Sequence, residues 1–192
     1  MGDKATFDLD FGKSLSISSD QILYDNKWGI YCLKPPLSFR YGITAIEIYH
    51  FTIGFKYQIE ILGSPNRIIS IPFKTYFGLS SEKVFALYKS VVDVLWHYHF
   101  DEVYVELLDK FKKGQDITFD KDYTLNQEGL LLNRRNLIVP FEDMRIKQNQ
   151  EYFSVYSVKN HKTAVFIYYL KTWNAQVLLS ILCSLIEDNI KT

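Results

Sequence analysis

Cysteine is scarce in this sequence, and its scarcity excludes two kinds of scaffold. Only Cys32 and Cys183 occur among the 192 residues, and they lie far apart in the chain. Two cysteines cannot form a disulfide framework, and no Cys-x-x-Cys or Cys/His spacing typical of zinc sites is present. The first residues also lack the basic and apolar segments of a signal peptide. We therefore expect two reduced thiols in a cytoplasmic protein that has no cofactor.

An excess of charge of either sign is missing as well. Lys and Arg number 22, Asp and Glu also number 22, and the charges balance on each side of Gly114. A surface that holds nucleic-acid phosphates needs a surplus of basic residues, so we expect no nucleic-acid partner. The hydrophobic fraction of 47% and the aromatic fraction of 16% instead predict a packed core.

No hydrophobic run in the sequence reaches the length of a membrane-spanning helix. The longest uncharged stretch, residues 172–186, has fifteen residues and includes Asn174, Gln176, Ser180 and Ser184. A spanning helix needs about 20 predominantly apolar residues. We expect no transmembrane segment and interpret residues 173–188 as a buried helix that closes the chain.

The first half of the chain is predicted to be strands followed by a helix. Alternating and β-branched residues indicate strands between positions 14 and 73, including a hairpin formed by residues 56–62 and 67–73. Pro35-Pro36 is expected to end a strand, and His50, in the apolar run Ile48-Tyr49-His50-Phe51, is interpreted as a strand residue. Apolar residues at helical spacing predict a helix over residues 81–98.

The second half repeats this order of elements. A helical linker over residues 100–113 is expected to join unit 1, residues 1–99, to unit 2, residues 114–192. Unit 2 should contain strands between 117 and 169 before the closing helix. Residues 15–24 can be aligned with residues 123–132, with apolar residues coinciding at Ile17 and Leu125. This weak similarity and the shared order suggest an internal duplication.

The second half also resembles a known family. Tyr123-Thr124-Leu125-Asn126-Gln127-Glu128-Gly129, the segment 138–146 and the helix start Trp173-Asn174 are similar to bacterial pleckstrin-homology-like (PH-like) domains. The resemblance implies an α+β, mostly β fold. It would consist of two tandem PH-like half-open β-barrels, each closed by a C-terminal helix and joined by the helical linker. It also implies binding without catalysis, which is an inference by analogy.

Catalytic and metal-binding patterns are weak. His97, His99, Asp101 and Glu102 form the densest group of potential metal ligands, but surface charge pairing beside a helix break explains them as well. No Gly-x-Ser-x-Gly motif and no glycine-rich phosphate loop occurs. We expect no catalytic residue, no metal and no enzymatic activity.

Two features remain as candidate binding sites. Arg134 and Arg135 lie at a predicted hairpin tip, where two guanidinium groups could hold an anion or a lipid headgroup. Leu179, Cys183 and Ile186 extend the apolar surface of the closing helix beyond the arc that one sheet covers. They predict packing against residues 103–111 or against a second chain.

These observations favour a non-catalytic binding or scaffold module that contacts a protein partner or a second copy of itself. Binding of an anion or lipid headgroup through Arg134 and Arg135 is the alternative, and an enzyme of unknown type is the third hypothesis.

Overall fold

The computed structural model describes residues 4–10, 12–64, 66–160 and 163–190. Contacts between Cα atoms divide the chain into unit 1, Met1–Asp101, and unit 2, Glu102–Thr192. The chain is mostly β, as the sequence predicts.

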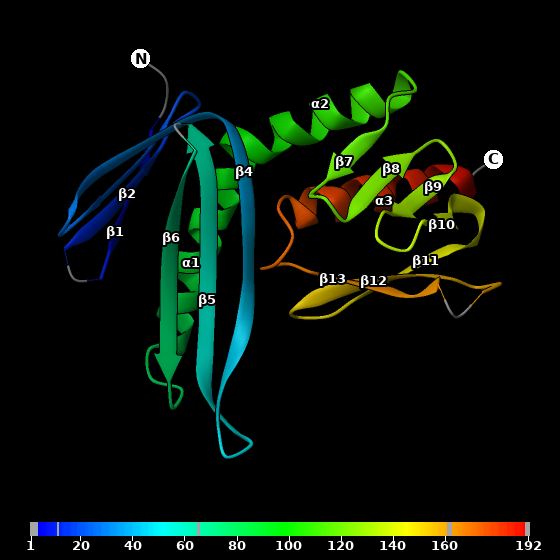
Figure 1. Cartoon of the computed structure of the whole chain (residues 1–192). Coiled ribbons are helices and arrows are strands. Elements are labelled where there is room, and N and C mark those ends of the chain that lie inside the picture. The colour runs from blue at the N-terminus through cyan, green and yellow to red at the C-terminus, as the bar shows by residue number, and fades with distance from the viewer. Residues whose placement is uncertain (1–3, 11, 65, 161–162, 191–192) are drawn as a thin grey trace. The chain divides into compact units, whose positions relative to one another are not determined.

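Unit 1 contains a six-stranded antiparallel sheet whose strands follow one another in chain order (Figure 1). The strands are β1 (Ala5–Leu9), β2 (Lys13–Ile17), β3 (Ile22–Asn26), β4 (Gly29–Ile48), β5 (Phe51–Ser64) and β6 (Arg67–Tyr76). The predicted hairpin of residues 56–62 and 67–73 is confirmed, because β5 pairs with β6 in a register that sets Leu62 opposite Ile68.

The long strand β4 changes its partner along its length. Residues 29–33 pair with β3, and the later residues pair with β5, with a register shift between Lys34 and Ser38. The prediction that Pro35-Pro36 ends a strand is wrong. The two prolines lie within the register shift, where the regular ladder of hydrogen bonds is interrupted and their missing N–H groups are tolerated.

One face of this sheet is buried under helix α1 (Ser81–Leu95). In β6, Ile69, Ile71 and Phe73 are buried, and the residues between them are exposed. The ring of Tyr88 on α1 lies 5.9 Å from Phe73 and 5.3 Å from Tyr57. This alternation of buried and exposed residues places the core of unit 1 between the sheet and α1.

The helical backbone continues after α1. A π-helical segment, η1 (Trp96–Phe100), follows α1, and α2 (Asp101–Lys112) follows η1. The rings of Trp96 and Phe100 stack at 4.8 Å, and Phe100 lies 4.4 Å from Phe39 on the sheet. The Trp96 indole N–H donates a hydrogen bond of 2.7 Å to the Tyr41 hydroxyl. These contacts tie η1 to the core of unit 1.

Unit 2 contains two further antiparallel sheets. The four-stranded sheet has the order β10-β9-β8-β7 and the three-stranded sheet has the order β11-β12-β13. Their strands are β7 (Ile117–Phe119), β8 (Tyr123–Asn126), β9 (Gly129–Leu132), β10 (Leu137–Pro140), β11 (Met144–Gln148), β12 (Tyr152–Ser157) and β13 (Val165–Tyr168). A short 3-10 helix, η2 (Phe141–Asp143), connects the sheets, and α3 (Ala175–Ile190) follows β13.

Helix α2 packs within unit 2. The Tyr104 and Ser184 hydroxyls are hydrogen-bonded at 2.9 Å, so α2 lies beside α3. Buried Phe111 contacts the ring of Phe141 edge-on at 5.9 Å. The Gln127 side-chain amide donates a hydrogen bond of 2.8 Å to the Phe111 carbonyl.

The predicted pair of PH-like half-open barrels, each closed by a C-terminal helix and joined by a helical linker, is wrong. The described strands form three antiparallel sheets, and none of these closes on itself. Unit 1 has one continuous sheet, whereas unit 2 divides its strands between two sheets. Residues 101–112 are not a separate linker, because α2 packs against η2 and α3. Local periodicity sets the order of elements, but long-range strand pairing sets the fold.

Candidate interaction site

The apolar end of unit 1 is formed by two neighbouring loops. We use this name for the β4–β5 turn, residues 48–51, and the β6–α1 loop, residues 76–80. The Phe77 backbone N–H donates a hydrogen bond of 2.6 Å to the carbonyl of Ile53 on β5, two residues after the turn, and so holds the β6–α1 loop against β5. Tyr76 and Leu79 form an isolated bridge within the second loop.

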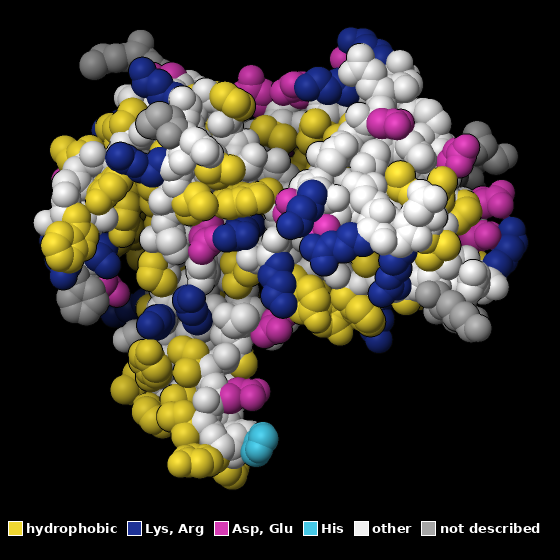
Figure 2. All heavy atoms as spheres, viewed as in Figure 1, with side chains coloured by type: hydrophobic (Ala, Val, Ile, Leu, Met, Phe, Trp, Pro, Cys, Tyr) yellow, Lys and Arg dark blue, Asp and Glu magenta, His cyan; other side chains and the backbone are white. Residues whose placement is uncertain are grey.

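Large apolar side chains at this end are exposed to solvent. The exposed fractions are 89% for Tyr49, 75% for Phe51, 75% for Phe77 and 73% for Leu79. Figure 2 shows hydrophobic side chains gathered over the far end of the β4–β5 hairpin. Single exposed apolar residues are ordinary, but a contiguous group of this kind marks an interaction surface.

The backbone of both loops is unfavourable for the residues that occupy it. Tyr49 and His50 have φ angles of 47° and 70°, which is the pattern of a two-residue type I′ turn. Such turns favour Asn-Gly or Asp-Gly, because bulky residues are strained at positive φ. Phe77 and Ser80 also have positive φ angles, of 51° and 55°. Strained non-glycine residues concentrate at functional sites.

A glycine anchors the hairpin behind these loops. Gly54 pairs with Tyr76 at the end of β6, and a Cβ atom at this position would lie 1.9 Å from the Thr75 carbonyl oxygen. Only glycine permits this close approach of β5 to β6. The apolar residues therefore project from strands that are held firmly together.

Two lysines lie behind the apolar end on the sheet. Lys56 on β5 and Lys74 on β6 are direct cross-strand partners, and among the described residues neither ammonium group forms an ion pair. Like charges in this arrangement repel each other and destabilise the pair of strands. Lys83 in the first turns of α1 adds a third cation, and Glu47 and Glu82 are the nearby acids in sequence. These three lysines and two glutamates leave one net positive charge, and the Lys56–Lys74 pair is its local concentration on the sheet.

The sequence did not predict this site. The sequence predicts His50 in a strand, but it is an exposed turn residue, because the turn occurs at Tyr49-His50 within the apolar run. Neither turn residue is Gly, Asn or Asp, so the usual turn signal is absent. The available signal was a short interruption of strand alternation between two long β segments.

The predicted anion site lies in the turn between β9 and β10 of unit 2. The Arg134 Nε atom is 2.6 Å from the Asp122 carboxylate, so this guanidinium already has an anionic partner. The Arg135 side chain is exposed in the same turn. Nearby Tyr123 has its pKa raised by burial, and the charge of Asp122 acts in the same direction. Anion binding by Arg134 and Arg135 stays a prediction.

The predicted apolar flank of the closing helix is half-buried. Leu179, Cys183 and Ile186 lie on α3. Ser184, which follows Cys183 on the same helix, contacts Tyr104 of α2. Burial raises the pKa of the Cys183 thiol, and the charge of Glu187 raises it further. Among the described residues, no helix combines the length and apolarity needed to cross a bilayer. Binding of a protein partner or a second copy by this flank stays a prediction.

The potential metal ligands around η1 have different environments. His97 is exposed, whereas His99 is buried and its ring lies 5.9 Å from Phe39. Within the part of the chain that the structure describes, no group of three or more His, Cys, Asp or Glu residues could hold a metal ion.

Comparison with protein-family models, with curated proteins and with solved structures finds no match to this chain. The resemblance of the second half to the PH-like family therefore stays a prediction. The geometry of the apolar end is the strongest basis for a proposal about function.

Proposed function

We propose that this protein is a non-catalytic binding protein that attaches to the surface of a lipid bilayer through the apolar end of unit 1. The exposure of Tyr49, Phe51, Phe77 and Leu79 on two neighbouring, strained loops carries the proposal. We place the protein in the cytoplasm, which is supported by its two free thiols. The cytoplasmic leaflet carries the anionic lipids that the proposed attachment requires.

The chemistry of the apolar end suits the interfacial region of a bilayer. Phe and Leu contribute about 1.5–3 kcal/mol each when they are fully buried in an apolar environment. Tyr49 can place its ring among acyl chains while its hydroxyl remains at the headgroups, as interfacial tyrosines do. Partial insertion of several such side chains is sufficient for reversible attachment.

The lysine pair lies at a suitable distance for contact with lipid phosphates. Lys56 is five positions after Phe51, which corresponds to about 17 Å along an extended strand. If the tip enters the acyl region, the long lysine side chains reach the headgroup layer. Each lysine near an anionic membrane surface contributes about 1 kcal/mol. Anionic headgroups would also relieve the repulsion between Lys56 and Lys74.

A bilayer explains the apolar end better than a protein partner does. Its side chains project from two loop tips at the end of a sheet, rather than forming a flat patch of the kind buried in most protein interfaces. A deformable lipid surface accepts such a tip without shape complementarity. The basic residues behind the tip complement anionic lipids.

The proposal can be tested by co-sedimentation with vesicles of phosphatidylcholine and phosphatidylserine in a 3:1 ratio. We expect the wild type to bind and the variant Tyr49→Ser/Phe77→Ser/Leu79→Ser to lose at least tenfold in partition coefficient. The variant Trp28→Ser/Ile30→Ser is the matched control, because it removes side chains that are 76% and 70% exposed from the opposite end of β4. It should bind like the wild type.

Three results would overturn the proposal. The wild type could fail to bind vesicles, or both serine variants could lose binding equally. Alternatively, sizing could show a dimer that dissociates in the Tyr49→Ser/Phe77→Ser/Leu79→Ser variant. In that case the apolar end would bind a second copy of the chain.

A further inference from the structure

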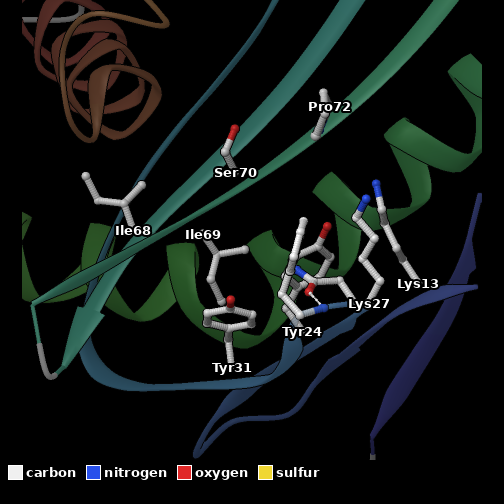
Figure 3. A pocket seen from close by; sticks show the side chains of 10 residues that line it. Lys13, Tyr24, Lys27, Tyr31, Ile68, Ile69, Ser70 and Pro72 are labelled. Carbon is white, nitrogen blue, oxygen red and sulfur yellow. Dashed lines mark hydrogen bonds between the residues drawn. The ribbon is translucent and has the colours of Figure 1, made fainter. Parts of the chain in front are cut away.

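A cavity of 380 Å³ opens in unit 1 near the β5–β6 turn, away from the apolar end. Figure 3 shows it between the first part of the sheet, from which Lys13, Tyr24 and Tyr31 point inward, and the edge strand β6. The change of partner along β4 produces this cavity, because it separates the β2–β3 part of the sheet from β6. Its volume falls within the range of small-molecule sites, about 300–1,000 Å³.

The walls of the cavity are aromatic and aliphatic. The Tyr24 and Tyr31 rings lie 6.4 Å apart, and the side chain of Ile69 lies beside Tyr31 (Figure 3). The Arg67 guanidinium lies 5.3 Å from the Tyr31 ring centroid and restrains this ring by a cation–π contact. Tyr24 is almost fully buried. A flat apolar group could therefore be placed against preformed rings.

Two cations occupy one side of the cavity. Figure 3 shows the Lys13 and Lys27 ammonium groups next to each other at the rim. None of the residues that line the cavity is acidic, and among the described residues neither lysine forms an ion pair. Asp25 follows Tyr24 in β3, and alternation along the strand directs its side chain to the opposite face. The two ammonium groups therefore attract an anion to this rim.

The edge of β6 that borders the cavity is poorly suited to adding another strand. Pro72 lies in the middle of β6 and has no N–H group to donate to an incoming peptide. Ser70 presents a single hydroxyl at the same edge. A compact molecule therefore fits this cavity better than an extended peptide.

We infer that this cavity binds a small organic anion with a flat apolar body. The carboxylate, sulfonate or phosphate group of the ligand contacts Lys13 and Lys27, and its body lies against Tyr24 and Tyr31. Nothing in this inference depends on membrane attachment, because the cavity and the apolar end share no residue.

The test uses 8-anilinonaphthalene-1-sulfonate as the probe. The protein carries Tyr49→Ser/Phe77→Ser/Leu79→Ser, which removes three of the exposed apolar side chains to which the dye would bind at the apolar end. We expect saturable binding at one site, at least tenfold weaker in Lys13→Gln/Lys27→Gln and unchanged in the control Lys83→Gln. The neutral analogue N-phenyl-1-naphthylamine should bind at least tenfold more weakly than the sulfonate.

Competition experiments distinguish the contribution of the ligand's anionic group to binding from that of its apolar body. We expect 2-naphthoate to displace the dye and inorganic phosphate at the same concentration not to displace it. The proposal is overturned if the dye shows no saturable binding, if Lys13→Gln/Lys27→Gln binds it like the parent, or if phosphate competes as well as 2-naphthoate. Circular dichroism establishes that the variants are folded, and the exposed position of Lys27 makes its replacement structurally mild.

Discussion

Lys56 and Lys74 face each other across β5 and β6, immediately behind the apolar end of unit 1. Two like charges in this position destabilise the isolated protein. Anionic lipid headgroups would convert the repulsion into a favourable contact. The repulsion between the two lysines therefore lowers the stability of the free protein, and the proposed attachment to a membrane would relieve it.

The variant Lys74→Gln tests this relationship. We expect its free energy of unfolding to stay the same or to rise by up to about 0.5 kcal/mol, because the repulsion is removed. Its partition onto vesicles that contain phosphatidylserine should fall about fivefold, which corresponds to about 1 kcal/mol. Lys89→Gln, at an exposed position on α1, is the control. Equal effects of the two substitutions would show that the position of Lys74 has no special role.

The turn at Tyr49-His50 should be stabilised by ordinary turn residues. The double substitution Tyr49→Asn/His50→Gly supplies the residues that a type I′ turn favours, and we expect it to raise the free energy of unfolding by about 1 kcal/mol in urea denaturation. Vesicle binding should decrease in the same variant because the Tyr49 ring is lost. A variant that is more stable and still binds vesicles fully would contradict a role of Tyr49 in attachment.

Tyr88 should make the protein sensitive to alkaline pH. The pKa of the Tyr88 phenol lies well above its ordinary value of 10.0, chiefly because the side chain is buried. The neighbouring Tyr41 and Tyr57 raise this pKa further. The unfolded chain therefore releases this proton at a lower pH than the folded chain does. The contribution of Tyr88 to the free energy of unfolding is fully present below about pH 10. It is lost as the pH rises through the pKa that Tyr88 has in the folded chain.

The measurement is urea denaturation as a function of pH for Tyr88→Phe. This variant keeps the ring that packs against Phe73 and Tyr57, and we expect it to lose less stability than the wild type above pH 10. Tyr49→Phe, at an exposed position, is the control and should follow the wild type. If the free energy of unfolding depends on alkaline pH identically in all three proteins, Tyr88 is not the source of the alkaline sensitivity.

The half-buried flank of α3 should contribute to the stability of unit 2. In Leu179→Glu/Ile186→Glu, two carboxylates would replace apolar side chains on the helix that Tyr104 of α2 contacts at Ser184. We expect the melting temperature of the monomer to fall by several degrees. If a dimer instead dissociates with little change in melting temperature, this flank binds a second chain.

Local pairing could be predicted from the sequence more reliably than the division into sheets. The aligned segments 15–24 and 123–132 are both hairpins, and the aligned residues occupy equivalent positions, with Ile17 opposite Ile22 and Leu125 opposite Leu130. The larger sheets differ because β4 continues through Pro35-Pro36 and pairs with both β3 and β5. Alternation along one strand does not reveal such a change of partner.

The apolar end could not be predicted for a different reason. Ile48-Tyr49-His50-Phe51 has the composition of a buried strand, and hydropathy alone does not distinguish a core residue from one exposed at a tip. Its turn lacks glycine and asparagine, so the usual signal is missing. The cation pair was equally hidden, because the opposition of Lys56 and Lys74 depends on the register of β5 and β6.

The most direct measurement of membrane attachment places an environment-sensitive nitrobenzoxadiazole dye at position 49. Tyr49→Cys is labelled in a chain that also carries Cys32→Ser/Cys183→Ser, and Ile30→Cys in the same background is the control. On addition of vesicles containing phosphatidylserine, we expect the emission of the dye at position 49 to shift to the blue and to be quenched by spin-labelled acyl chains. The dye at position 30 should remain unchanged. If the dye at position 49 stays in water while vesicles are present in excess, the apolar end does not insert and the proposed function is wrong.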